Sequence, residues 1–315
     1  MINKKILILE GGFNEEHEVS LKTSSEIQKI LKNLKIKFDT LLVNPNFFEK
    51  QIDKYKDHIC FNALHGPFGE DGQIQKILTK YKIQYTHSSV KSSKVCFDKV
   101  ASKKIVSKNK ILTPKYVTLK KKNLNLKNLL KIKKIFTNFI IKPCKSGSSY
   151  GIKIINNNKE FKNFLNNFEL FKDEIPYHED ILIEEFINGK ELTVSTINYL
   201  NDVKALGVTE INYKSTYFDY KAKYSKGRSK HILPANLTKK NYNKCLKLAL
   251  KCHKILDCKS IARTDFIYNS KKDKIYYLET NTQPGLTSVS LLPEQAKFNN
   301  ISFEAVILEI LKNLN

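Results

Sequence analysis

Long hydrophobic runs are missing from this sequence. The N-terminal segment has an apolar run of only four residues, Ile6 to Leu9, whereas a secretory signal peptide needs about 7–15 apolar residues and a membrane-spanning helix about 18 or more. No later segment reaches that length. We therefore expect neither a signal peptide nor a membrane span, and we expect a cytoplasmic protein.

Cysteine pairs with the spacing of a zinc site or a redox motif are also missing. The six cysteines include no C-x-x-C pair. Cys252, His253 and Cys258 do lie close together in the sequence, but in or beside a predicted helix. Scattered cysteines of this kind are typical of reduced, structural thiols in a reducing compartment. The sequence therefore favours neither a disulfide framework nor a cysteine-based metal site.

Acidic residues are few compared with basic ones, since 31 Asp and Glu stand against 55 Lys and Arg, a formal net charge of +24. Such a charge can indicate a nucleic-acid partner, because basic surfaces attract phosphates. The lysines are, however, spread over every segment, and abundant Lys, Asn and Ile together are typical of an A/T-rich genome. The densest basic run, Lys120 to Lys134, is interleaved with leucines and predicts a helix with a solvated face. Because no nucleic-acid-binding motif is present, we expect no nucleic-acid partner, and a non-enzymatic RNA-binding protein is a distant alternative.

What the chain does contain is an alternation of strand and helix patterns, which predicts an α/β fold divided into lobes. Residues 1–88 predict a parallel-sheet lobe, residues 89–180 a middle lobe and residues 181–315 a C-terminal lobe. A long polar segment rich in Tyr and Lys, residues 214–234, is typical of a lid loop. The predicted elements are strands at 4–9, 36–43, 58–62, 83–85, 139–143, 152–155, 181–187, 190–199 and 203–209, and helices at 20–34, 71–80, 92–109, 238–256 and 302–313.

Three glycine-rich loops follow predicted strands. They read GGFNEEHEVS at 11–20, HGPFGEDG at 65–72 and CKSGSSYG at 144–151. The third can close over phosphates with backbone N–H and hydroxyl donors. None is G-x-G-x-x-G, and G-x-x-x-x-G-K-[ST] is absent, which excludes the dinucleotide fingerprint and the P-loop. Tight turns explain the first two loops equally well, and His65 is as compatible with a buried structural role as with a functional one.

Segment 260–285 predicts a β-hairpin with its polar chemistry on one face. Side chains alternate along a strand, so Arg263 and Asp265 share a face of the first strand, and Glu279 and Asn281 share the corresponding face of the second. A cross-strand ion pair on a solvated face explains this pattern. A Mg²⁺ site explains it too, because that ion prefers a few carboxylate or carbonyl oxygens together with phosphates and water. The hairpin alone leaves both interpretations open.

The register of this hairpin is also predicted. If Tyr268 pairs with Lys274 across the polar turn, Arg263 faces Glu279 and Asp265 lies diagonal to Glu279. Asp265 then faces Tyr277. The residues predicted on the opposite, core face are Ala262, Phe266 and Leu278.

These segments, in this order, resemble the D-alanine–D-alanine ligase family of ATP-grasp enzymes over essentially the whole chain. GGFNEEHEVSL is similar to the family's GG-x-S-x-E-x-E-V-S, and LHGPFGEDG to L-H-G-x-x-G-E-D-G. IIKPCKSGSSYGI is similar to K-P-x-x-x-G-S-S-x-G, and FDYKAKY to Y-D-Y-x-x-K-Y. The hairpin and the loop after it are similar to R-x-D followed by E-x-N-T-x-P-G-(M/L)-T-x-x-S-L-x-P. The resemblance implies an ATP-grasp fold with an N-terminal Rossmann-like lobe, a small central lobe and a C-terminal catalytic lobe.

The resemblance also implies an activity, the ATP-dependent joining of two D-alanines through a D-alanyl phosphate for peptidoglycan precursor synthesis. It implies ATP as co-substrate, two Mg²⁺ (or Mn²⁺) ions and a homodimer. The residues implied at the ATP site are Lys99, Lys142 and Lys223 for phosphates, Glu184, Phe186 and Ile187 for adenine, and Glu191 for ribose. The implied metal ligands are Asp265, Glu279 and Asn281.

Further residues are implied at the two amino-acid sites. Glu16 would bind the first ammonium group, and His65 would lie near the first carboxylate. Arg263 and the Gly285 N–H would stabilise the tetrahedral oxyanion. The second carboxylate would be held by Ser290 and the Leu291 N–H. The residues implied to close the lid in a hydrogen-bonded triad are Glu16, Ser148 and Tyr224.

Close relatives leave an alternative. A D-alanine–D-lactate ligase or another ATP-grasp carboxylate–amine ligase would share most of these motifs, although Tyr224 favours dipeptide synthesis. The departures from the family pattern are few. His17 stands where Arg is usual, Phe218 replaces the first Tyr of the lid motif and Leu286 stands where Met is common, and none of these changes removes a reacting group.

Overall fold

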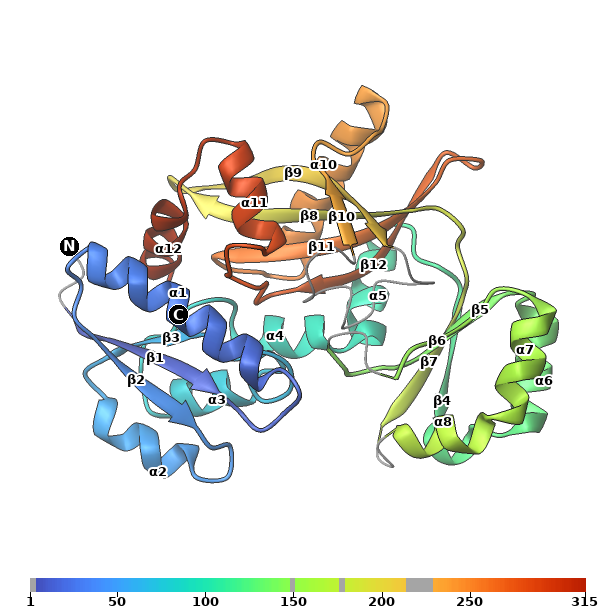
Figure 1. The fold of residues 1–315 in the computed structure, drawn as a ribbon, viewed down its shortest axis with the longest axis horizontal. Coiled ribbons are helices and arrows are strands. Elements are labelled where there is room, and N and C mark those ends of the chain that lie inside the picture. Colours follow the sequence, from blue (N-terminus) through green and yellow to red (C-terminus); the bar gives the residue numbers. More distant parts are fainter. Residues whose placement is uncertain (1–3, 148–150, 176–178, 214–228) are drawn as a thin grey trace.

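The fold was described from a computed structural model, which places residues 4–147, 151–175, 179–213 and 229–315 (Figure 1). The predicted site residues Ser148, Lys223 and Tyr224 lie outside the described residues, as does most of the lid expected at 214–234.

The N-terminal part is a three-stranded parallel sheet in the order β2-β1-β3. The apolar run at the start of β1 is completely buried because helices cover both faces of the strand. Ile6 and Ile8 pack with α1 and α12, whereas Leu7 and Leu9 pack with α2 and α3. The strand predicted at 83–85 is reduced to a single bridge between Tyr85 and Cys60. The elements are β1 (Ile6–Gly11), α1 (His17–Asn33), β2 (Phe38–Val43), α2 (Phe48–Ile52), η1 (Asp53–Tyr55), β3 (Ile59–Asn62) and α3 (Gln73–Lys80), with α12 (Phe303–Lys312) from the other end of the chain.

The middle part is a four-stranded antiparallel sheet in the order β4-β7-β5-β6. Phenylalanines of α7 and α8 pack with Phe139 and Ile141 of β5 in its core. Neither helix was predicted, and β4 was not predicted either. The elements are β4 (Tyr116–Lys120), η2 (Lys121–Asn123), α6 (Leu126–Ile135), β5 (Phe139–Pro143), β6 (Lys153–Ile155), α7 (Asn158–Asn166), α8 (Phe168–Glu174) and β7 (Asp180–Glu185).

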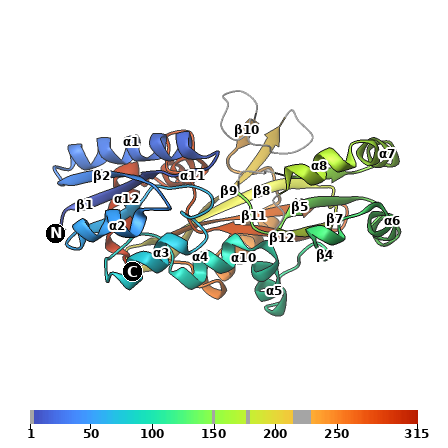
Figure 2. The ribbon, with the colours of Figure 1, turned by 90° about the horizontal axis from the view of Figure 1, so that it is seen from below.

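The C-terminal part is a five-stranded antiparallel sheet in the order β10-β9-β8-β11-β12. Figure 1 shows it between the other two sheets, and Figure 2 shows the three parts following one another along the long axis of the molecule. The elements are β8 (Lys190–Tyr199), β9 (Asp202–Tyr213), β10 (Ser229–Ile232), α10 (Lys239–Ile255), β11 (Ile261–Asn269), β12 (Lys274–Asn281) and α11 (Leu291–Phe298), besides α12.

The single helix predicted at 92–109 is wrong, because the chain forms two helices, α4 (Val90–Phe97) and α5 (Lys99–Lys108). Asp98 between them is extended, with φ −87° and ψ 103°. Its Oδ1 accepts hydrogen bonds from the N–H groups of Val100 and Ala101, both at 3.0 Å. Asp98 is therefore the N-cap of α5, and Asp is among the residues that favour this position.

The sheets confirm the predicted α/β class and the parallel N-terminal sheet. The lobe boundaries at 88/89 and 180/181 stay a prediction. Most of β7 (Asp180–Glu185) follows the 180/181 boundary, yet β7 pairs with β4 and β5 of the middle sheet. Helices α4 and α5 follow the 88/89 boundary, yet their Cys96 and Val106 belong to the core of the C-terminal sheet.

The predicted hairpin register is wrong in two ways. Tyr268 pairs with Ile275 rather than with Lys274, and a bulge then shifts the ladder by one more residue, so Arg263 faces Asn281 rather than Glu279. Asn269 pairs with Lys274 and Phe266 with Tyr277, but the next pair is Asp265 with Glu279, so Leu278 has no opposed residue. A β-bulge of this kind puts two successive side chains on the same side of a strand. Leu278 therefore lines a cavity beside Glu279, and the buried core position expected for Leu278 is taken by Tyr277. Ala262 and Phe266 are buried as predicted.

None of the helices in the described part of the chain is both long and apolar enough to cross a membrane. All six cysteines are free thiols.

Candidate active site

Two adjoining cavities lie where the three parts of the fold meet. The larger has a volume of about 320 Å³ and is lined by β5, β6 and β7 on one side and by β8, β11 and β12 on the other. The smaller, of about 80 Å³, is lined by the N-terminal loops and by the loop after β12. The residues that line both cavities are Lys99, Ser146, Gly147, Arg263 and Glu279. A molecule that fills both would therefore pass these five residues.

Most residues predicted at the ATP site meet in the larger cavity. Its floor is apolar, with isoleucines from both sheets and the bulged Leu278. An apolar cavity with a few convergent charged groups is the usual form of a small-molecule site. The predicted site residues that line it are Lys99, Lys142, Glu184, Phe186, Ile187, Glu191, Arg263, Asp265, Glu279 and Leu291.

A buried group of ion pairs holds Lys142, one of the two lysines in the described part of the chain that line this cavity. Lys142 contacts Oε1 of Glu184, and Lys103 Nζ lies 3.0 Å from Oε2 of the same carboxylate. Lys103 and Glu184 are 0% and 1% exposed. Burial lowers the pKa of Lys103 to about 8, although Glu184 opposes that shift. For Glu184 burial acts to raise the pKa, but the two lysines outweigh it and the pKa falls below its ordinary value.

Lys142 keeps its charge in this group of ion pairs. Burial alone would lower its pKa, but Glu184 and then Glu279 outweigh that effect and raise it. A protonated lysine at the end of β5, beside the Ser/Gly loop, is suited to a phosphate group.

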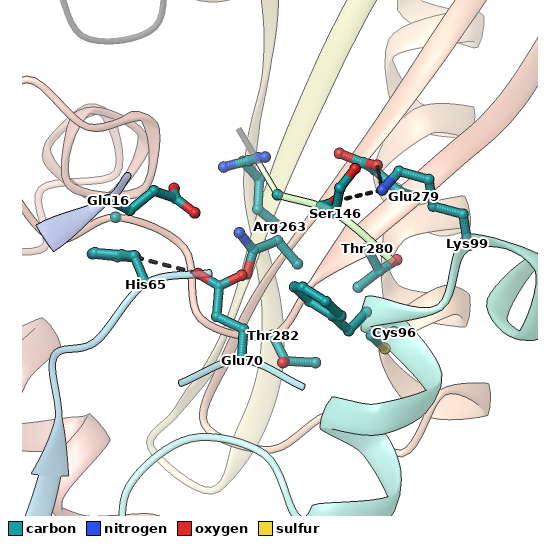
Figure 3. Close-up of a pocket in the computed structure, with 14 residues that line it drawn as sticks. Glu16, His65, Glu70, Cys96, Lys99, Ser146, Arg263, Glu279, Thr280 and Thr282 are labelled. Atoms are coloured by element: carbon teal, nitrogen blue, oxygen red, sulfur yellow. Dashed lines mark hydrogen bonds and ion pairs between the residues drawn. The ribbon is translucent and has the colours of Figure 1, made fainter. Parts of the chain in front are cut away.

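Lys99 joins the Ser/Gly loop to the hairpin. As the first residue of α5, it donates a hydrogen bond from Nζ to the Ser146 carbonyl oxygen at 2.6 Å. Its Nζ also lies 3.7 Å from Oε2 of Glu279. Figure 3 shows both contacts as dashed lines.

The three predicted metal ligands share the cavity side of β11 and β12. Asp265 is opposed to Glu279, and Asn281 is opposed to Arg263. Asp265 is held from two sides: Arg263 donates from Nε to Oδ1 (3.0 Å) and from Nη2 to Oδ2 (2.8 Å), and Thr193 donates from Oγ1 to Oδ1 (2.6 Å).

Two carboxylates and one amide oxygen fit Mg²⁺, which takes few protein ligands and keeps phosphate and water oxygens. Within the described ranges no group of three His, Cys, Asp or Glu side chains is arranged to hold a metal ion.

The smaller cavity gathers acidic and imidazole groups from the N-terminal loops. Glu16, His65 and Glu70 are all buried and line it together with Arg263 (Figure 3). His65 Nε2 lies 2.9 Å from Thr23 Oγ1, and its Nδ1 lies 3.3 Å from Glu70 Oε1. Both ring nitrogens are thus engaged, which fixes the orientation of the imidazole ring.

Glycines bring two loops against the Glu16 carboxylate. A Cβ atom on Gly66, where φ is +72°, would lie 2.5 Å from Glu16 Oε2, and one on Gly147 would lie 2.9 Å from the same oxygen. Side chains at either position would displace the carboxylate. Glycine at these two positions therefore does more than allow a turn, because it leaves room for the Glu16 carboxylate between the two loops.

The loop after β12 carries the last predicted residues. Gly285 lines the smaller cavity, whereas Ser290 lines neither of these two cavities and its Oγ lies 2.8 Å from Thr287 Oγ1. A Cβ on Gly285 would lie 2.8 Å from Ser290 Oγ, so Ser290 is adjacent to the cavity wall. Leu291 lines the larger cavity.

Three contributors were not predicted. Glu70 belongs to a loop that was singled out, but only His65 was chosen from it. Lys103 lies in a lysine-rich segment where every lysine looks solvated; its spacing of four residues from Lys99 was the available signal, because residues i and i+4 share a helix face. Thr193 gave no local signal, since only the pairing of β8 with β11 brings it opposite Asp265.

Known proteins resemble this chain over nearly its full length. Residues 105–312 match the family model for the C-terminal part of D-Ala-D-Ala ligases. The chain is 42% identical to the D-alanine–D-alanine ligase of Pelagibacter ubique, covering 99% of this chain and 98% of that protein. It is 38% identical to the corresponding ligase of Rickettsia typhi, covering 98% and 91%.

Solved structures show the same fold. The D-alanine–D-alanine ligase of Bacillus anthracis, crystallised with ATP, matches with a TM-score of 0.79 at 28% identity, covering 98% of this chain and 96% of that one. The VanG D-Ala:D-Ser ligase of Enterococcus faecalis matches with a TM-score of 0.78 at 26% identity, covering 98% and 99%. The predicted ATP-grasp architecture is thereby confirmed, and the chain belongs to the D-alanine–D-alanine ligase family.

Proposed function

We propose that this protein joins two D-alanine molecules into D-alanyl-D-alanine and converts ATP to ADP and phosphate. One observation carries the proposal: a nucleotide-sized cavity and a smaller acidic cavity meet at Lys99, Arg263 and Glu279. Full-length similarity to ligases of this name supports it. The product is a peptidoglycan precursor.

ATP lies in the larger cavity between the middle and C-terminal sheets. Phe186 and Ile187 pack at the adenine edge, and Glu191 binds the ribose. Lys99 and Lys142 bind phosphate oxygens at the end that adjoins the smaller cavity. Glu184 acts there by holding Lys142 in place, which the buried group of ion pairs supports. Lys223 adds a third phosphate contact by resemblance, outside the described residues.

Asp265, Glu279 and Asn281 would hold two Mg²⁺ ions (or Mn²⁺). When bound, these ions neutralise charge on the β- and γ-phosphates. Arg263 orients Asp265 through its two hydrogen bonds.

In the first step, the carboxylate oxygen of the first D-alanine forms a bond to the γ-phosphorus, and the bond from that phosphorus to the β,γ-bridging oxygen breaks. ADP leaves, and D-alanyl phosphate is formed. Glu16 binds the ammonium group of this substrate, and His65 lies beside its carboxylate. The lysines stabilise charge that spreads over the transferring group, so positioning and electrostatics supply most of the catalysis.

In the second step, the neutral amine of the second D-alanine attacks the acyl carbon, the bond from that carbon to the phosphate oxygen breaks, and the proton lost by the amine leaves with the inorganic phosphate. Arg263 and the Gly285 N–H stabilise the oxyanion of the tetrahedral intermediate. Ser290 and the Leu291 N–H hold the second carboxylate. Exclusion of water by the 214–234 segment, through a triad of Glu16, Ser148 and Tyr224, protects the acyl phosphate; that triad rests on the resemblance alone. We place the reaction in the cytoplasm, in a homodimer, which light scattering of the purified chain can test.

The test is a coupled assay of ADP release with Mg²⁺ and a panel of D-alanine, L-alanine, D-serine and D-lactate, with products identified by mass spectrometry. D-Alanine-dependent ADP release with D-alanyl-D-alanine as the main product is expected. A dominant ester with D-lactate near neutral pH would instead identify a depsipeptide ligase. Tight, salt-sensitive RNA binding without turnover would overturn the enzymatic assignment.

A further inference from the structure

Gln283 crosses between the C-terminal and N-terminal parts of the site. It lies between Asn281 and Gly285, at the position that the pattern E-x-N-T-x-P-G leaves open, and is 2% exposed. Its Oε1 accepts a hydrogen bond from Asn62 Nδ2 at 2.8 Å. Its Nε2 donates to the carbonyl oxygen of Leu64. One side chain therefore joins the loop after β12 to the loop after β3.

Asn62, its partner, organises the loop that carries the first-substrate residues. Asn62 Nδ2 also donates to the Gly69 carbonyl oxygen (2.9 Å), and Asn62 Oδ1 accepts from the Leu64 N–H (3.2 Å). His65 directly follows Leu64, and Glu70 directly follows Gly69. Through Asn62, Gln283 is therefore linked by one further hydrogen bond to Leu64 and to Gly69, the residues directly before His65 and Glu70.

The same residue is tied to a predicted metal ligand. The Gln283 N–H donates to Asn281 Oδ1 at 2.7 Å. A continuous run of hydrogen bonds therefore leads from Asn281, through Gln283, to the backbone before His65. Asn62, Leu64 and Gln283 are each at most 2% exposed, so water cannot substitute for these bonds without opening the interface.

The Gln283 amide satisfies both partners at once. The Asn62 amide requires an acceptor and the Leu64 carbonyl requires a donor, which Gln offers at the two ends of one planar group, whereas Glu is acceptor-only and Met is neither. Burying an unpaired partner is unfavourable.

We propose that Gln283 is a positioning residue, which sets the N-terminal loops, where the first D-alanine binds, against the hairpin that carries the predicted metal ligands beside the phosphate site. This inference rests on the proposed function. Reaction rates are sensitive to misplacement of reacting groups by about 1 Å, and the two groups that must meet come from parts of the chain more than two hundred residues apart.

The experiment compares Gln283→Met with wild type and with Gln51→Met. Gln51 is a matched control because its amide also bridges two groups, the Asn44 N–H and the Leu42 carbonyl, but within the N-terminal part alone. Gln283→Met is expected to lower kcat/KM for D-alanine at least about tenfold, to leave KM for ATP nearly unchanged and to release more ADP than dipeptide. Gln51→Met should keep wild-type values for all three.

A second readout needs no turnover. Amide hydrogen exchange of the ligand-free protein should speed up in Gln283→Met over residues 63–72 and stay unchanged in α2. If wild type shows no D-alanine-dependent ADP release, the proposed function fails. Hydrogen exchange still reports whether Gln283 holds the loop at residues 63–72 in place. Unchanged exchange at 63–72, or a KM for ATP that rises in step with KM for D-alanine, would overturn the positioning role.

Discussion

Asp265 and Glu279 face each other directly across β11 and β12, because the bulge at Leu278 advances the register by one residue. Without it, a regular ladder continued from the Phe266–Tyr277 pair would oppose Asp265 to Leu278. The bulge brings the two carboxylates together on the cavity side and keeps Tyr277 in the core. Bulges re-aim side chains in this way next to active sites.

Glu279→Gln is expected to lower turnover at least about a hundredfold, because it weakens charge stabilisation at the transferring phosphate. The change retains the size of the side chain, and ADP release at saturating D-alanine measures the effect. Glu304→Gln, an exposed carboxylate in α12, is the control and should behave as wild type. Near-normal activity of Glu279→Gln would show that Glu279 is not a metal ligand.

Thr193→Val tests how Asp265 is oriented. The substitution keeps the shape of the side chain but removes the hydroxyl that donates to Asp265 Oδ1 at 2.6 Å. Groups that orient a metal ligand typically contribute about 10–100-fold in metal affinity, so half-saturation should need about tenfold more Mg²⁺. Thr209→Val is matched to it, since Thr209 lies opposite Thr193 on β9 and contacts Gln295 instead. Equal Mg²⁺ requirements in the two variants would contradict this role.

Local patterns predicted most strands, because period-two alternation and turn residues depend only on neighbours in the sequence. They also placed Arg263 on the polar face of the hairpin and Lys142 at the end of a strand, whereas Glu184 came from the family resemblance. The break at Asp98 was also readable, since Asp at an N-cap is a local signal that the lysine-rich periodicity obscured.

What could not be predicted depends on contacts between distant segments. The bulge at Leu278 reflects the fit of β12 to both the core and the cavity, which no turn residue specifies. Only its four-residue spacing from Lys99 separates Lys103 from its solvated neighbours in the sequence, and its burial follows from Glu184, which β7 brings against it. The contact between Gln283 and Asn62 joins loops of different sheets.

Gly147→Ala tests the close approach of the Ser/Gly loop to Glu16. The new Cβ would lie 2.9 Å from Glu16 Oε2, and that flexible carboxylate can move aside. We expect KM for D-alanine to rise roughly tenfold through misplacement of the ammonium-binding group, with little change in the midpoint of thermal unfolding or in KM for ATP. An unchanged KM for D-alanine would mean that Glu16 tolerates displacement and does not bind the first substrate tightly.

Lys103 should give the stability a pH dependence that Lys103→Met lacks. Burial lowers the pKa of Lys103 from its ordinary 10.5 to about 8 in the folded protein. Between these values the unfolded chain binds more protons than the folded one, so this group makes the free energy of unfolding increase as the pH rises. From about pH 7.5 to about pH 10, the free energy of unfolding of the wild type should increase by about 2 kcal/mol relative to that of Lys103→Met. Urea unfolding of both proteins at several pH values measures it. A difference that stays constant would mean that Lys103 keeps an ordinary pKa despite its burial beside Glu184, and one that shrinks toward high pH would mean that its pKa is raised; either result contradicts the prediction.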